Sequence, residues 1–187
     1  MIIFSDMDKE SIRARVKARK NLLDDAERAS AAESVFGLIE KTAAFIMSEH
    51  ILMYNSLPDE LSTRAFIDRW HTRKHFYLPR VNGVNLDILP YDRSRLHLGS
   101  FRIEEPEGDD TVDISAIDLI IVPGVAYDRR GNRIGRGRGF YDRLLRDARA
   151  VTVGVAYGCQ LVDDIEPDEF DVPVDYVVTE HGLIRVP

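Results

Sequence analysis

The sequence predicts an α/β fold, a single three-layer α/β/α domain over residues 1–187 with a mainly parallel central sheet and a small hairpin. Continuous apolar runs such as residues 118–123, bounded by Asp and Pro, are typical of strands that are covered on both faces. Segments with helical spacing alternate with these runs, as in right-handed parallel crossovers. A length of 187 residues suits one domain, and the chain has no linker, repeat or low-complexity segment.

Four segments have the apolar spacing of helices that pack on one face: residues 9–23, 26–47, 64–73 and 140–148. In the first, Lys9 and Arg13 are four residues apart and therefore share a face. Gly37 is a weak point in the second. Ser62 or Thr63 is the expected cap of the third.

Six segments have the composition of strands: residues 51–54, 75–79, 85–89, 118–123, 151–156 and 176–179. The Asn82-Gly83 turn makes the second and third of these a hairpin. Ligands of parallel sheets bind beyond the carboxyl ends of the strands. The loops that follow residues 51–54 and 118–123 are therefore the expected site.

The second of these loops is rich in arginine and glycine. Residues 128–142 read DRRGNRIGRGRGFYD, with five arginines and four glycines in a chain of net charge −7. Glycines allow backbone N–H groups to close on phosphate oxygens, and the loop enters a predicted helix at its anion-binding end. The spacing is neither that of the P-loop nor that of the dinucleotide motif. From these residues alone, a phosphate cradle and a solvated surface loop both remain open.

The composition disfavours several classes of protein. No stretch approaches the roughly 18 apolar residues of a membrane helix, so we expect no membrane partner. The acidic balance disfavours nucleic-acid binding. The first residues lack the basic region and apolar core of a secretory signal, which predicts a cytoplasmic location. The single Cys159 excludes an intramolecular disulfide, and the five histidines lack zinc-type spacing.

Residues 122–145, VPGVAYDRRGNRIGRGRGFYDRLL, closely resemble the signature of the 5-formyltetrahydrofolate cyclo-ligases, also called methenyltetrahydrofolate synthetases. The likeness continues in family order at residues 9–13, 56–63, 78–80, 105–106, 160 and 171–175. It implies an enzyme that uses ATP and Mg²⁺ to close 5-formyltetrahydrofolate to 5,10-methenyltetrahydrofolate through a phosphorylated formyl intermediate, releasing ADP and phosphate. The expected partners are these small molecules, and the expected state is a monomer or weak homodimer.

The resemblance also implies roles for individual residues. The ATP-binding positions are Lys9, Arg13, Arg133, Gly135, Arg136, Gly137, Arg138, Gly139, Phe140 and Tyr141. Of these, Arg136, Arg138 and Tyr141 would take part in catalysis. Asn55, Glu60, Arg136 and Phe140 would bind the folate, and Asp142 and Asp175 would bind Mg²⁺. Glu60, an acceptor-only side chain, suits the N–H groups of a pterin ring.

Two positions depart from the family pattern. Many members have tyrosine where this chain has Phe140, and Asn55 stands where an apolar residue is common. Two other functions remain as alternatives: a binding module that holds RNA or another polyanion on the basic loop, and a different ATP-dependent or sugar-phosphate enzyme on the same architecture. RNA binding needs neither Glu60 nor the acidic pair Asp142 and Asp175, so their presence favours the cyclo-ligase.

Overall fold

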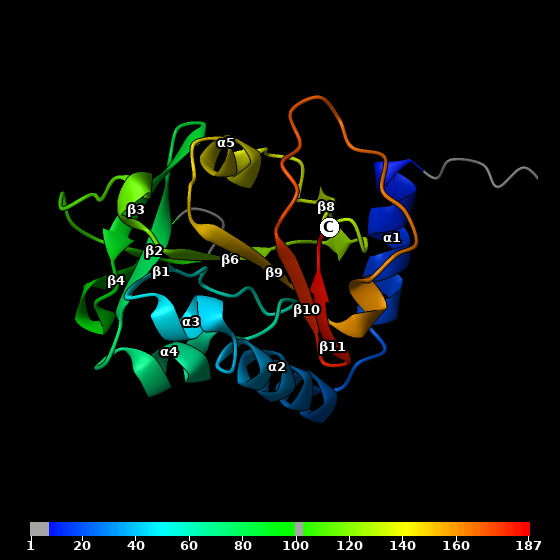
Figure 1. Cartoon of the computed structure of the whole chain (residues 1–187), viewed down its shortest axis with the longest axis horizontal. Coiled ribbons are helices and arrows are strands. Elements are labelled where there is room, and N and C mark those ends of the chain that lie inside the picture. The colour runs from blue at the N-terminus through cyan, green and yellow to red at the C-terminus, as the bar shows by residue number, and fades with distance from the viewer. Residues whose placement is uncertain (1–7, 100–102) are drawn as a thin grey trace, which may run out of the picture.

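A seven-stranded sheet forms the centre of the structure, a computed structural model that describes residues 8–99 and 103–187 (Figure 1). The strand order is β11-β10-β9-β6-β1-β2-β3. The inner strands from β10 to β2 are parallel, while β11 and β3 run antiparallel to their neighbours at the two edges. The predicted α/β class and mainly parallel sheet are confirmed. The first residues, on which the signal-peptide prediction was based, lie outside the described part.

The strands of this sheet are β1 (His50–Leu52), β2 (His75–Asn82), β3 (Asn85–Pro90), β6 (Leu119–Pro123), β9 (Val151–Val155), β10 (Tyr176–Thr179) and β11 (Gly182–Arg185). Two small hairpins lie apart from it, β4 (Leu96–Leu98) with β5 (Glu104–Pro106), and β7 (Ala126–Tyr127) with β8 (Arg133–Ile134). All six predicted strands are present, and β2 and β3 form the predicted hairpin. The other strands were not predicted, because two to four residues are too few to show a period.

The helices are α1 (Lys9–Lys20), α2 (Asp25–Ile39), α3 (Ala43–Met47), α4 (Arg64–Trp70) and α5 (Phe140–Arg146). None of the helices in the described residues combines the length and the apolar character needed to cross a membrane. Thr63 is the N-cap of α4, as predicted, but its hydroxyl donates to Tyr54 O instead of accepting from the helix.

The prediction of one helix over residues 26–47 is wrong. The chain turns at residues 40–42, and the break comes from Thr42 rather than from Gly37, which stays inside α2. The Thr42 hydroxyl donates to Ile39 O (2.7 Å) and accepts from Phe45 N (3.2 Å), so one side chain ends α2 and caps α3.

The two faces of the sheet are covered unequally. Helices α2, α3 and α4 cover one face, where Phe36 packs in a large core that includes Ile51 (Figure 1). The neighbouring Leu52 points to the opposite face and packs with Tyr127 and Leu145. In the described residues, α5 is the only α-helix that packs in this core, and a short 3-10 helix at Ile114–Ala116 and irregular segments complete the layer. The predicted third layer is therefore present but thin.

The order in which the parallel strands are added to the sheet reverses between β1 and β6. From β1 the chain adds β2 on one side, and then places β6, β9 and β10 in turn on the other side. The loops that leave the carboxyl ends of β1 and β6 therefore turn away from each other. Such a switch point leaves a crevice in which ligands of α/β proteins bind.

A buried carboxylate fixes the turn between β7 and β8. Asp128 is 0% exposed and accepts hydrogen bonds from the backbone N of Arg130 (2.8 Å), Asn132 (3.0 Å) and Ile165 (3.1 Å), and from Asn132 Nδ2 (2.9 Å). This turn begins the segment that leads through β8 into the arginine- and glycine-rich loop. Asp128 therefore fixes the start of the segment that leads to the glycine-rich turn at residues 135–139.

We expect Asp128→Ala to lower the free energy of unfolding by about 3 kcal/mol, because several buried donors lose their acceptor together. Urea unfolding followed by circular dichroism measures the loss. Asp113→Ala is the control, since the Asp113 carboxylate accepts from Ser115 N on the exposed turn at Ile114–Ala116 and its loss should cost about 1 kcal/mol or less. Equal, small losses in the two variants would contradict the structural role of Asp128.

Candidate active site

A cavity of about 600 Å³ lies at the switch point, between the loops that follow β1 and β6. Its walls include an apolar surface from the β2–β3 hairpin and the segment before β5, formed by Pro79, Val81, Leu86 and Ile103. All predicted site residues except Asp175 line it: Lys9, Arg13, Asn55, Glu60, Arg133, Gly135, Arg136, Gly137, Arg138, Gly139, Phe140, Tyr141 and Asp142. Residues of both loops thus line one concave site of a size typical for small-molecule ligands.

Two glycines determine the shape of the loop at residues 135–139. Gly137 has φ +89° and Gly139 has φ +64°, a left-handed conformation that side chains with a Cβ rarely adopt. Gly139 is also the N-cap of α5. The exposed Arg136 precedes Gly137, and the exposed Arg138 lies between Gly137 and Gly139, so the backbone conformation of this loop sets the positions of the two cations.

Helix α1 brings Lys9 and Arg13 to the cavity, as their shared face predicted. Arg13 Nε donates to Gly135 O (3.0 Å), which ties the helix to the start of the loop. Lys9 Nζ donates to Asp168 Oδ2 (2.5 Å) and to Asp171 Oδ2. Burial lowers the pKa of Lys9, but the two carboxylates outweigh it and raise that pKa overall. For Asp171, burial raises the pKa, but the hydrogen bonds from Lys9 and from the Asp168 backbone, together with the positive charges of Lys9 and Arg133, outweigh burial and lower the pKa overall.

Arg133, Tyr141 and Asp142 form a buried group on the floor of the cavity. The Arg133 side chain is 4% exposed, and its Nη2 donates to Asp142 Oδ1 (2.6 Å). Its guanidinium lies 5.8 Å from the centre of the Tyr141 ring. Among the described residues, Arg133 Nε and the Tyr141 hydroxyl are buried without a hydrogen-bond partner, and such groups normally find one. Burial raises the pKa of Tyr141, so its hydroxyl stays protonated and can donate.

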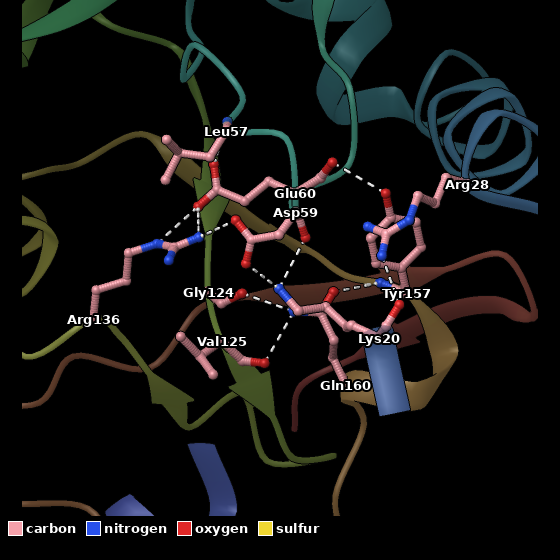
Figure 2. Close-up of polar contacts among 10 residues, drawn as sticks. All are labelled: Lys20, Arg28, Leu57, Asp59, Glu60, Gly124, Val125, Arg136, Tyr157 and Gln160. Carbon is pink, nitrogen blue, oxygen red and sulfur yellow. Dashed lines mark hydrogen bonds and ion pairs between the residues drawn. The ribbon is translucent and has the colours of Figure 1, made fainter. Parts of the chain in front are cut away.

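Arg136, predicted to bind both ATP and the folate, contacts Glu60, predicted to bind the folate (Figure 2). Arg136 Nε and Nη2 donate to Glu60 Oε1 at 3.2 and 3.0 Å, and Nη2 also donates to Asp59 Oδ1 (2.8 Å). Glu60 Oε2 accepts from Leu57 N (3.0 Å). An ion pair therefore connects the loop after β1 with the loop after β8.

Asn55 holds the rim of the cavity. Its Nδ2 donates to Glu104 O (2.9 Å), which joins the loop after β1 to β5. An apolar residue at this position, common in the family that the sequence resembles, lacks this hydrogen bond. The departure seen in the sequence therefore adds a tie between two segments of the wall.

Asp175 does not reach the cavity, so the expectation that it lies beside Asp142 is wrong. It precedes β10, and its Oδ2 accepts from Thr152 N and Thr152 Oγ1, both at 2.8 Å. These groups stand at the amino ends of β9 and β10, at the sheet edge opposite the cavity. Asp171, at the other end of the Asp-Val-Pro-Val-Asp stretch, lines the cavity. Sequence reasoning missed Asp171 and Asp168, although the stretch itself was the signal.

The chain is similar to known proteins over most of its length. The sequence model of the 5-formyltetrahydrofolate cyclo-ligase family matches residues 5–180. The 5-formyltetrahydrofolate cyclo-ligase of Escherichia coli K12 is 36% identical over 144 residues, which cover 72% of this chain and 79% of that protein. The Haemophilus influenzae protein of the same name is 31% identical over 180 residues, covering 89% of this chain and 94% of its relative.

Solved structures show the same fold. The NMR structure of Aquifex aeolicus 5,10-methenyltetrahydrofolate synthetase superposes with a TM-score of 0.88 at 32% identity, and covers 96% of this chain and 93% of that one. The Mycoplasma pneumoniae 5,10-methenyltetrahydrofolate synthetase, at 19% identity and a TM-score of 0.74, covers 93% and 99% and supports the fold alone.

Proposed function

Because this chain belongs to the 5-formyltetrahydrofolate cyclo-ligase family and is an enzyme of that activity, a ligase of folate one-carbon metabolism, we propose how it performs the reaction. It closes 5-formyltetrahydrofolate to 5,10-methenyltetrahydrofolate at the expense of ATP, with Mg²⁺, through a phosphorylated formyl group. The observation that carries the proposal is that the glycine- and arginine-rich loop and Glu60 line one cavity. Transfer from a nucleotide to a folate requires both in the same place.

The chemistry explains why ATP is consumed. A formyl oxygen is a poor leaving group, so the γ-phosphoryl group is first transferred to it and ADP leaves. The formyl carbon becomes electrophilic, and the N10 amine attacks it. The C–O bond then breaks, N10 loses its proton, and the former formyl oxygen departs within inorganic phosphate. The protein must position the two substrates and neutralise phosphate oxygens, as in other phosphoryl transfers.

The cations around residues 133–138 serve the phosphates. Arg133 Nε and the Tyr141 hydroxyl, buried and without partners, are donors for oxygens of the transferring group. Arg136 and Arg138 offset its charge from the exposed side of the loop. Lys9 and Arg13 hold the loop and the 168–171 segment around the nucleotide. Tyr141 acts as a hydrogen-bond donor rather than as a base, because burial keeps it protonated.

The carboxylates of the cavity fit Mg²⁺ bound together with a nucleotide. Among the described residues, no group of three or more His, Cys, Asp or Glu side chains is arranged to hold a metal by itself. Mg²⁺ commonly keeps several waters and takes one or two carboxylates plus substrate phosphates. Asp142 and Asp171, which line the cavity, would supply these carboxylates. The bound ion would neutralise charge on the phosphate oxygens.

The folate occupies the side of the cavity next to the β2–β3 hairpin. Val81, Leu86 and Phe140 provide an apolar surface for the flat pterin ring. Glu60 accepts from its N–H groups. We propose that the protein acts on these small molecules in the cytoplasm, as a monomer or weak homodimer.

Turnover tests the proposal directly. The purified protein, mixed with 5-formyltetrahydrofolate, ATP and Mg²⁺, should produce the near-ultraviolet absorbance of the methenyl product and one ADP for each product formed. Leaving out ATP or Mg²⁺ should abolish both signals. ADP without methenyl product would point to another ATP-dependent enzyme, and RNA binding without turnover would point to a polyanion-binding module.

We expect Glu60→Gln to raise the KM for 5-formyltetrahydrofolate by roughly 10- to 100-fold, the cost of one or two hydrogen bonds to a charged acceptor. Initial rates over a range of folate concentrations at saturating ATP measure it. Glu104→Gln is the control, because the exposed Glu104 carboxylate pairs with Arg64 and its side chain is 44% exposed. An unchanged KM in Glu60→Gln would remove Glu60 from the folate site.

A further inference from the structure

Lys20, the last residue of α1, is a buried cation whose partner lies in the loop after β1. Its side chain is 4% exposed, and its Nζ donates to Asp59 Oδ2 (2.6 Å) and to Asp59 O (2.8 Å) (Figure 2). A buried ammonium is costly without such partners. Asp59 is therefore held by Lys20 through both its side chain and its backbone.

The second oxygen of Asp59 holds Arg136. Oδ1 accepts from Arg136 Nη2 (2.8 Å), so that Lys20, Asp59 and Arg136 form a continuous chain from helix α1 to the loop after β8 (Figure 2). Burial raises the pKa of Asp59, but the hydrogen bonds and positive charges of Lys20 and Arg136 together outweigh burial and lower that pKa overall. Asp59 is thus a charged acceptor whose Oδ2 is held by Lys20 and whose Oδ1 holds Arg136.

Glu60 holds the same guanidinium, but only as long as no folate is bound to Glu60. Its Oε1 accepts both Arg136 Nε and Nη2, and Leu57 N occupies Oε2. A pterin that donates to Glu60 competes with Arg136 for Oε1. When Glu60 turns to the folate, the bond from Nη2 to Asp59 remains and Nε is released toward a phosphate oxygen.

We propose that Asp59, fixed by Lys20, is a positioning residue that keeps the Arg136 guanidinium in the cavity once Glu60 binds the folate. This rests on the proposed function. The same helix supports the neighbouring residue, because Arg13 Nε donates to Gly135 O (3.0 Å). Helix α1 thereby holds the loop at two consecutive residues, one through the backbone and one through Asp59.

The test compares Asp59→Asn, Lys20→Met and the double variant. Asp59→Asn should lower kcat by roughly 10- to 100-fold, as expected when a catalytic group is misplaced by about 1 Å, while the KM for folate changes less than about twofold. Lys20→Met should lower kcat to the same degree, and the double variant should show no further loss, since the residues act in one chain. Asp59→Glu, which keeps the carboxylate, should have a higher kcat than Asp59→Asn.

Glu33→Gln is the matched control, because it removes another carboxylate that accepts from an arginine, Arg69, far from the cavity. It should keep the wild-type kcat. Thermal unfolding and calorimetric binding of Mg·ADP accompany each variant. Asp59 is half exposed, so Asp59→Asn should fold even if Lys20→Met does not.

Wild-type kcat in a folded Asp59→Asn protein would overturn the proposal. Additive losses in the double variant, or a loss that follows only the melting temperature, would also overturn it. Absence of turnover in the wild-type protein would instead refute the proposed function and the positioning role with it. A lower kcat with an unchanged folate KM in Asp59→Asn, not seen in Glu33→Gln, supports it.

Discussion

Arg138→Ala should reduce kcat/KM for ATP by on the order of 10³-fold, the lower end of what an arginine on a transferring phosphoryl group contributes. Arg138 lies between Gly137 and Gly139 and lines the cavity. It is exposed, so its removal should change stability by less than about 0.5 kcal/mol. Initial rates over a range of ATP concentrations, together with the melting temperature, separate a catalytic loss from an unfolding one.

Arg129→Ala is the control within the same loop. Arg129 is exposed and is not among the residues that line the cavity. Its removal should change kcat/KM by less than about twofold, because an exposed charge away from the ligand is largely screened by salt. Equal, small effects of the two substitutions would mean that the arginines act as a diffuse positive field, and the assignment of Arg138 to the phosphates would fail.

Asp142→Asn should affect both catalysis and stability. The carboxylate pairs with Arg133, whose side chain is 4% exposed, and removing one partner of a buried ion pair costs about 3 kcal/mol, or roughly 10 °C in Tm for a chain of this length. The concentration of Mg²⁺ that gives half-maximal activity should rise at least about 10-fold, because one of the two carboxylates proposed to bind Mg²⁺ is lost. Mg²⁺ titrations of activity and thermal unfolding measure the two effects.

Asp110→Asn controls for the loss of an acidic partner. Asp110 accepts from the Arg95 guanidinium in an exposed pair, which contributes about 1 kcal/mol or less. This variant should keep the wild-type dependence on Mg²⁺. If Asp142→Asn lowered the stability but left the dependence of activity on Mg²⁺ unchanged, the role of Asp142 would be only to neutralise Arg133.

The centre of the fold was predictable because parallel strands are buried on both faces and therefore appear as continuous apolar runs. Residues 118–123 and 151–156 show this plainly, and both are strands of the sheet. The division of α2 from α3 was not predictable from apolar spacing. It depends on the hydroxyl of Thr42, a local contact that the spacing of Val35, Ile39 and Ile46 does not reveal.

The cavity residues were predictable where a motif keeps them together in the sequence, as for residues 133–142. The motif does not show which of Asp171 and Asp175 faces the cavity, because the three residues between them carry the chain from the cavity to the opposite end of the strands. The pairing of Lys20 with Asp59 joins positions 39 residues apart. No periodicity connects them, and only the packing of α1 against the switch-point loops brings them together.

The contact between Glu60 and Arg136 has a thermodynamic consequence for the proposed reaction. The two side chains form an ion pair, and a substrate that binds either one has to break it. A pterin that engages Glu60 frees part of Arg136 for the triphosphate, and a triphosphate that attracts Arg136 frees Glu60 for the pterin. Under the proposed assignments, linkage requires these effects to be equal, so binding of either substrate should raise the affinity of the enzyme for the other.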